Sequence, residues 1–165
     1  MVTLNEFNSR ASEELWPELL ACCDVPAWAD AVLRARPYAD IDGVLATASE
    51  LAAGLAGPDV ERALAAHPRI GDRVSGTDTH SKWSRQEQSG VSDDADVAAQ
   101  LLDGNLAYEQ RFGRVFLICA TGLSAEQILA SLTRRLTNDD ATEAAEVAEE
   151  LRKIAVLRLR KVFTA

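Results

Sequence analysis

The sequence predicts an all-α protein, folded as a single-domain helical bundle over residues 1–165. Hydrophobic residues make up 47% of the chain and aromatic residues only 5%. The hydrophobic share is mostly alanine and leucine, which favours close helix packing over a β-sandwich. Apolar residues recur at helical spacing with short breaks between the runs, and 165 residues fit one domain. We therefore expect one helical core.

Helix signals follow one another through the first half of the chain. We expect helices over residues 12–22, over residues 26–36, from Asp40 or Asp42 to about residue 55, and over residues 58–66. Gly57 is expected to end the third of these helices. Pro58 suits the first turn of the fourth, because its fixed backbone angle matches a helix start. His67 is therefore expected at a helix carboxyl end.

The second half opens with a polar connection over residues 71–82, which we expect to be a loop. Further helices are expected around Glu87, from Ser92–Asp94 to about residue 111, over residues 124–136, and over residues 138–163. Ser124 and Gln127 have the spacing of a capping box, and Asn138 can cap the last helix. The apolar run at 115–120 is predicted as a strand or a buried helix.

The charge and the cysteines limit the classes of function. A net charge of −9 argues against a nucleic-acid surface, which needs a basic stripe to neutralise phosphates, and against an anionic membrane. The longest apolar run, Val115–Ala120, is far shorter than the roughly 20 residues that span a bilayer. The three cysteines have neither metal-ligand spacing nor a disulfide pattern, which indicates a reducing compartment. We expect a soluble cytoplasmic protein.

One of the two histidines is the strongest candidate for chemistry. His67 precedes Pro68, whose ring disfavours helix at the preceding residue, so the imidazole projects from a rigid corner. Such a group can act as an acid or base near neutral pH. A helix stop followed by a turn closing at Gly71 explains the same string. His80 lies in a polar stretch and is expected to be exposed.

A second polar string lies at Ser84, Glu87 and Gln88. It places a hydroxyl, a carboxylate and an amide close in sequence to the imidazole, and such a set can orient a small polar ring. The alternative is structural, because Ser84 and Glu87 also match the capping-box pattern.

Arg158 falls in the middle of the apolar stripe of the last predicted helix, beside Leu151, Ile154, Ala155 and Val162. A buried guanidinium needs an anionic partner, which is either an internal carboxylate or an anionic ligand. Cys119 lies in an apolar run and is expected to be a buried structural thiol. The sequence has no glycine-rich phosphate loop or zinc-ligand pattern, so any catalysis is expected to need no cofactor and no metal.

Together these strings resemble the OHCU decarboxylase family, enzymes of purine and urate degradation that convert 2-oxo-4-hydroxy-4-carboxy-5-ureidoimidazoline to (S)-allantoin. The likeness spans nearly the whole chain. It rests on His67-Pro68-Arg69-Ile70-Gly71, Ser84-x-x-Glu87-Gln88, the run from Phe112 to Gly122, Asn138-Asp139, and Lys153-Ile154 with Arg158-Leu159.

The resemblance implies a helical bundle of the family's own type, a homodimer, and a carboxy-lyase that needs neither metal nor organic cofactor. It implies that His67 and Glu87 are the catalytic pair. The substrate-binding set that it implies is Pro68, Ser84, Gln88, Phe116, Leu117, Ile118, Cys119, Ala120 and Arg158. Leu123 departs from the family, in which many members have a basic residue at this position, and substrate affinity is where we expect an effect.

Two other functions fit the same residues. The first is a non-catalytic helical module that binds an acidic metabolite or a partner helix without turnover. The second is a cofactor-free lyase or hydrolase acting on a related ureido or imidazole compound. The presence of both His67 and Glu87 disfavours the first alternative.

Overall fold

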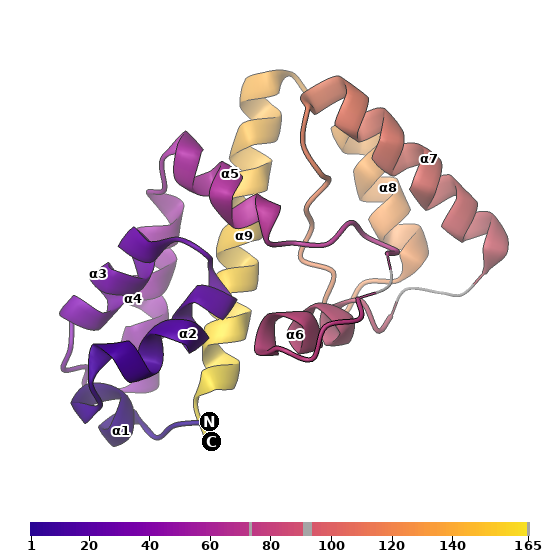
Figure 1. Ribbon diagram of the computed structural model, residues 1–165. Coiled ribbons are helices and arrows are strands. Elements are labelled where there is room, and N and C mark those ends of the chain that lie inside the picture. Colours follow the sequence, from indigo (N-terminus) through magenta and orange to yellow (C-terminus); the bar gives the residue numbers. More distant parts are fainter. Residues whose placement is uncertain (73, 91–93, 165) are drawn as a thin grey trace. The chain divides into compact units, whose positions relative to one another are not determined.

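The computed structural model describes residues 1–72, 74–90 and 94–164, and over these residues the chain is helical, with one isolated β-bridge (Figure 1). The helices are α1 (Leu4–Ser9), α2 (Ser12–Cys22), α3 (Pro26–Arg34), α4 (Ile41–Ala53), α5 (Gly57–Ala65), α6 (Thr79–Glu87), α7 (Ala95–Phe112), α8 (Ala125–Arg135) and α9 (Asp140–Val162). The all-α prediction is confirmed. Within the described residues, none of the helices combines the length and apolar character needed to cross a bilayer.

The chain divides into two compact units. Unit 1 consists of residues 1–66 and 151–165, and unit 2 consists of residues 67–150, so that α9 contributes to both. The expectation of a single domain stays a prediction.

Unit 1 is built around α2, α3 and α4, with the second half of α9. Trp28 of α3 is buried, and its indole nitrogen donates to the carbonyl oxygen of Ala48 in α4 at 3.0 Å. The two ends of the chain meet here, because the amide of Val2 donates to the carbonyl of Val162 at 2.8 Å and the amide of Thr164 donates to that of Val2 at 2.9 Å. Both ends of the chain are thus fixed in unit 1.

The apolar stripe of α9 is buried as predicted. Leu151, Ile154, Ala155 and Val162 are each at most 3% exposed, and Arg158 in their middle is 0% exposed. The helical periodicity of the sequence therefore located the buried arginine correctly.

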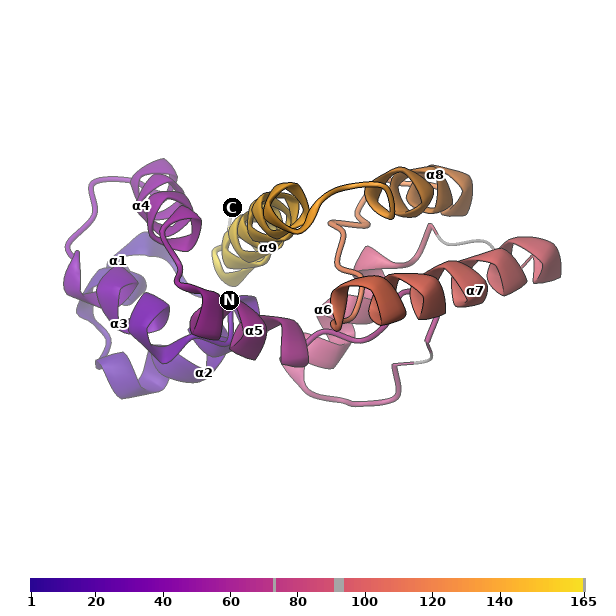
Figure 2. The same cartoon turned by 90° about the horizontal axis from the view of Figure 1, so that it is seen from above.

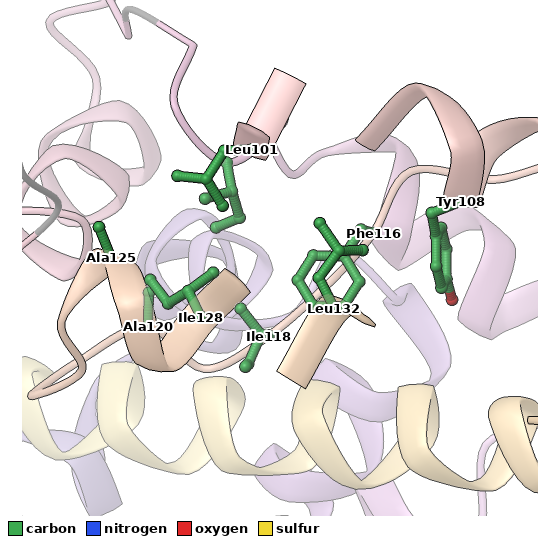
Figure 3. Close-up of a cluster of buried hydrophobic side chains, with 9 residues drawn as sticks. Leu101, Tyr108, Phe116, Ile118, Ala120, Ala125, Ile128 and Leu132 are labelled. Carbon is green, nitrogen blue, oxygen red and sulfur yellow. The ribbon is translucent and has the colours of Figure 1, made fainter. Parts of the chain in front are cut away.

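Unit 2 places α7 and α8 against each other, side by side in both views (Figures 1 and 2). A cluster of buried side chains fills the space between these helices and the connection that follows α7 (Figure 3). Its members are Ile70, Leu101, Tyr108, Phe116, Ile118, Ala120, Ala125, Ile128 and Leu132. Ile70 belongs to the string that contains His67, so this core anchors the candidate site.

A buried ionic network crosses unit 2. Glu143 of α9 is 0% exposed and accepts hydrogen bonds from the guanidinium of Arg135, the hydroxyl of Tyr108 and the amide of Asn138. Burial and the neighbouring Glu143 carboxylate raise the pKa of Tyr108 to about 12. Arg135 also donates to the carbonyl oxygen of Leu117 at 2.7 Å. The network therefore links α7, α8 and α9 to the connection that follows α7.

Several predicted helix limits are confirmed. Helix α2 has the predicted bounds, Asp40 caps α4, Pro58 lies in the first turn of α5, and Ser124 and Gln127 form the capping box of α8. Gly113 ends α7 in the left-handed conformation, with φ of 71°.

Other expectations about the elements were wrong. Helix α4 ends at Ala53 with Gly54 as its C-cap, and Gly57 begins α5 instead of ending α4. Asp139, not Asn138, caps α9, because its carboxylate accepts from the amide of Thr142 at 2.7 Å, whereas the Asn138 side chain is used by Glu143.

The apolar run at 115–120 is neither strand nor helix. Helix α1 was not predicted; a capping box between Thr3 and Glu6 begins it. Of the predicted start of α7, Asp94 is the cap, while Ser92 and Asp93 lie outside the described residues.

Candidate active site

The string that contains His67 forms a corner followed by a tight turn. Helix α5 ends at Ala65, so His67 and Pro68 lie outside it, as predicted. The amide of Asp72 then donates to the carbonyl oxygen of Arg69 at 3.1 Å. Gly71 is the third residue of this turn and has φ of 90°, a conformation that a type II turn requires there and that glycine adopts without strain. His67 itself is half-buried.

Helix α6 presents the second polar string. Asp78 caps this helix by accepting from the amide of Ser81. Ser84 and Glu87 therefore lie inside the helix, and the capping-box explanation for them was wrong. Residues 80, 84 and 87 are spaced by four and three positions, so His80, Ser84 and Glu87 share one face of α6. Ser84 on this face is 2% exposed.

Two contacts join the strings within unit 2. The rings of His67 and His80 meet edge to face with centroids 5.3 Å apart. The side-chain oxygen of Gln88, at the carboxyl end of α6, accepts from the amide of Gly71 at 3.0 Å. His80 therefore contacts His67 and is the first residue of the helix face that contains Ser84 and Glu87.

His80 is a candidate site residue that the sequence did not point to. It was expected to be exposed, but it is half-buried and contacts the ring of His67. Its spacing from Ser84 and Glu87 is the signal that could have identified it, once residues 79–87 are taken as a helix.

Helix α7 holds the His67 string from another direction. The guanidinium of Arg69 donates two hydrogen bonds to the carboxylate of Glu109, at 2.8 and 2.9 Å. This side-chain hydrogen bond with Glu109 raises the pKa of Arg69. One turn earlier on α7, the side-chain nitrogen of Asn105 donates to the carbonyl oxygen of Ile70 at 3.0 Å. Neither contact is predictable from local sequence patterns, because the partners are 35 and 40 residues apart.

The predicted binding segment Phe116–Ala120 follows α7 as an irregular stretch of backbone. Phe116, Ile118 and Ala120 pack in the same cluster as Ile70, which brings the segment to the His67 string. Leu117 is also buried, and its carbonyl oxygen accepts from Arg135. Cys119 is half-buried, which corrects the expectation of a fully buried thiol.

Arg158 belongs to unit 1, where it contacts α2. Its guanidinium donates to the carbonyl oxygen of Ala21 in α2 at 3.0 Å. The buried thiol of Cys23, next to the end of α2, has its pKa raised to about 12, chiefly by burial, against which the charge of Arg158 acts.

The chemistry available in unit 2 is that of acids and bases. It comprises half-buried imidazole, carboxylate and amide groups and a buried hydroxyl, from His67, Glu87, Gln88 and Ser84. Across residues 1–72, 74–90 and 94–164, no three histidine, cysteine or acidic side chains gather as a metal site.

Comparisons with known proteins agree on one family. The family model of OHCU decarboxylase matches residues 8–160. A 2-oxo-4-hydroxy-4-carboxy-5-ureidoimidazoline decarboxylase of Amia calva is 34% identical over 141 residues, which cover 84% of this chain and 81% of that protein. The uric acid degradation bifunctional protein of Bacillus sp. (strain TB-90) is 26% identical over 99% of this chain, which corresponds to 32% of its own length.

A solved structure has the same fold. The crystal structure of an OHCU decarboxylase in the presence of (S)-allantoin is 26% identical in sequence and matches with a TM-score of 0.76, covering 90% of this chain and 99% of that one. With the helical fold, these comparisons place the protein among the decarboxylases. The chain belongs to the OHCU decarboxylase family.

Proposed function

We propose that this protein decarboxylates 2-oxo-4-hydroxy-4-carboxy-5-ureidoimidazoline to (S)-allantoin in urate degradation. Family membership supports this reaction. The observation that supports the site is the meeting of the two polar strings, through the ring contact of His67 with His80 and the hydrogen bond from Gly71 to Gln88.

The substrate supplies most of the chemistry. When the bond between the ring carbon and its carboxylate breaks, carbon dioxide leaves and the electron pair moves toward the adjacent carbon–nitrogen double bond. One proton is then taken up, so that carboxylate plus proton yields allantoin plus carbon dioxide. The protein must orient the ring, stabilise the developing charge and deliver the proton to one face, and a preorganised site achieves these effects well.

His67 and Glu87 are the residues that we propose for this work. An imidazole exchanges protons near neutral pH, so His67, oriented by Glu87, takes the proton of the substrate hydroxyl. Ser84, Gln88 and the segment Phe116–Ala120 hold the ring, and Pro68 fixes the backbone beside the imidazole. No metal or organic cofactor takes part in this scheme.

The test is circular dichroism during turnover of freshly generated substrate, because only stereospecific decarboxylation produces (S)-allantoin faster than the spontaneous racemic route. His67→Ala and Glu87→Gln are expected to remain folded and to form optically active allantoin far more slowly. Glu126→Gln makes the same chemical change at an exposed position of α8 and is the matched control. Wild-type turnover by either site variant would remove its residue from the mechanism.

The same assay separates the alternatives. A binding module would bind allantoin without any turnover, and a lyase or hydrolase for another ureido compound would leave the racemic route unchanged. We also propose that Arg158 binds substrate, as family resemblance implies, so that Arg158→Ala raises the Michaelis constant more than it lowers kcat. An unchanged Michaelis constant would contradict this role.

Family resemblance also leads us to propose a cytoplasmic homodimer. Light scattering of the purified protein would measure its mass, and a monomeric mass at working concentration would contradict the dimer.

A further inference from the structure

The peptide group that joins Ile70 to Gly71 is held from both sides by side chains. Its carbonyl oxygen accepts from the side-chain nitrogen of Asn105 on α7 at 3.0 Å, and its N–H donates to the side-chain oxygen of Gln88 after α6 at 3.0 Å. This peptide is the central one of the turn that follows His67. We call Asn105 and Gln88 the turn clamp.

Each hydrogen bond of the turn clamp fixes the orientation of an amide. A backbone carbonyl can only accept, so Asn105 must present its nitrogen to Ile70. A backbone N–H can only donate, so Gln88 must present its oxygen to Gly71. The nitrogen of Gln88 is thereby left to face other partners with its two hydrogens, and a ligand atom at this position must be a hydrogen-bond acceptor.

The turn clamp stabilises one of the two conformations that this turn can adopt, type I and type II. Types I and II of a β-turn differ by a flip of the central peptide, which reverses the directions of its C=O and N–H. The flip would break both hydrogen bonds at once. The two hydrogen bonds also tie the turn to α7 and to the end of α6. Because Pro68 restricts the backbone between His67 and the turn, fixing the turn also fixes the place of the imidazole.

The surroundings of Asn105 indicate that its donor group is needed. Asn105 is 1% exposed and lies between Leu101 and Tyr108 on the buried face of α7. Among the residues that the structure describes, the side-chain oxygen of Asn105 accepts no hydrogen bond. A buried polar atom without a partner lowers stability, so an apolar side chain would suit the core better at this position. Asparagine at position 105 therefore lowers stability, and its side-chain nitrogen donates a hydrogen bond to the turn.

We infer that Asn105 is a positioning residue: through the turn clamp it holds the His67 loop and the amide of Gln88 in the orientations that substrate binding and decarboxylation require. This inference rests on the proposed function for its kinetic readout. It assigns to the position of Gln88 an acceptor group of the substrate, such as a carbonyl or carboxylate oxygen.

The first test compares two buried positions of α7. Asn105→Leu keeps the branched shape and the number of side-chain heavy atoms, with a larger volume, but removes the donor. We expect kcat/KM to fall about tenfold, as small misplacements of a catalytic group do. Leu101→Ala, one turn away on the same face, removes packing from the cluster to which Ile70 also belongs but leaves both hydrogen bonds of the turn clamp in place. We expect it to lower stability, with a smaller fall in kcat/KM than in Asn105→Leu. Equal losses in the two variants, or full activity of Asn105→Leu, would overturn the inference.

The second test does not depend on activity. Hydrogen exchange measured by NMR is expected to show a protected Gly71 amide in the wild-type protein, and loss of that protection in Asn105→Leu but not in Leu101→Ala. Gln88→Glu can still accept from Gly71 but offers no donor to a ligand, so we expect retained protection together with a raised Michaelis constant. A Gly71 amide that exchanges freely in the wild-type protein would overturn the turn clamp even if Asn105→Leu fails to fold.

Failure of the proposed function and failure of the turn clamp can be told apart. If the wild-type protein does not accelerate formation of (S)-allantoin, the proposed function fails, and Gly71 protection still tests the turn clamp. If turnover is normal and Gly71 is unprotected, only the turn clamp fails.

Discussion

Arg135 offers a direct measure of what the buried ionic network contributes to stability. Replacing it by methionine preserves most of the apolar stem but removes the positive charge. We expect the free energy of unfolding to fall by about 3–5 kcal/mol, the usual cost of breaking a buried ion pair by removing one partner. On a total of roughly 5–15 kcal/mol for a native protein, this is a large loss.

The contacts of Arg135 explain this magnitude. Its guanidinium is 1% exposed, donates to the 0% exposed carboxylate of Glu143 and to the carbonyl of Leu117, and lies 4.5 Å from the ring centre of Phe116. In the variant, Glu143 keeps neutral donors such as the hydroxyl of Tyr108 but loses the guanidinium of Arg135. Removal of this cation from a buried carboxylate accounts for most of the expected loss.

The neighbouring arginine is a matched control. Arg134 pairs with Glu146 at 2.7 Å, but its side chain is 58% exposed, so Arg134→Met is expected to cost no more than about 1 kcal/mol. Urea denaturation followed by far-UV circular dichroism measures both variants. Arg135→Met/Glu143→Leu removes both partners of the ion pair, so much of the stability should return. If Arg135→Met costs no more than Arg134→Met, the reasoning is refuted.

Three further predictions concern acid stability, thiol reactivity and the second imidazole. The hydrogen bond from Arg134 lowers the pKa of Glu146 from 4.5 to about 2. Stabilisation by this pair is therefore complete above pH 4.5 and is lost as the pH falls through about 2. Urea denaturation should show that the stability advantage of the wild-type protein over Glu146→Gln disappears across that range. Cys119 is half-buried while the other two cysteines are buried, so mass spectrometry should find it alkylated first and (S)-allantoin should slow its reaction; equal rates for the three thiols would contradict this. His80→Ala should lower kcat roughly two- to tenfold through loss of the edge-to-face contact with His67, and His80→Phe should restore part of it; equal rates for the two variants would show that the ring is not needed.

Periodicity and caps made much of the fold predictable. The bounds of α2, the capping box of α8 and the burial of Arg158 depend on residues within one or two turns of each other, and all three were predicted. The site strings around His67 and Glu87 were also identified from the sequence. The contact of His67 with His80 and the hydrogen bond from Gly71 to Gln88 are visible only in the structure.

Contacts between distant segments account for what the sequence did not show. Periodicity indicates that position 105 faces the core, but not that its amide meets a turn 35 residues earlier. The capping-box pattern at Ser84 and Glu87 was misleading because the same spacing occurs inside helices, and only the competing cap at Asp78 decides between them. Asn138 failed as a cap because Asp139 accepts the free amide and Glu143 uses the asparagine.

The bridge between Val2 and Phe163 makes this fold easy to combine with others. A polypeptide whose entry and exit points are neighbours can be appended to, or inserted into, a longer protein through short linkers without pulling its ends apart. The matched Bacillus protein, which is named a bifunctional protein, is a longer polypeptide, and this chain corresponds to 32% of its length. Neighbouring ends suit this fold to engineered tandem proteins in which a second domain follows through a short linker.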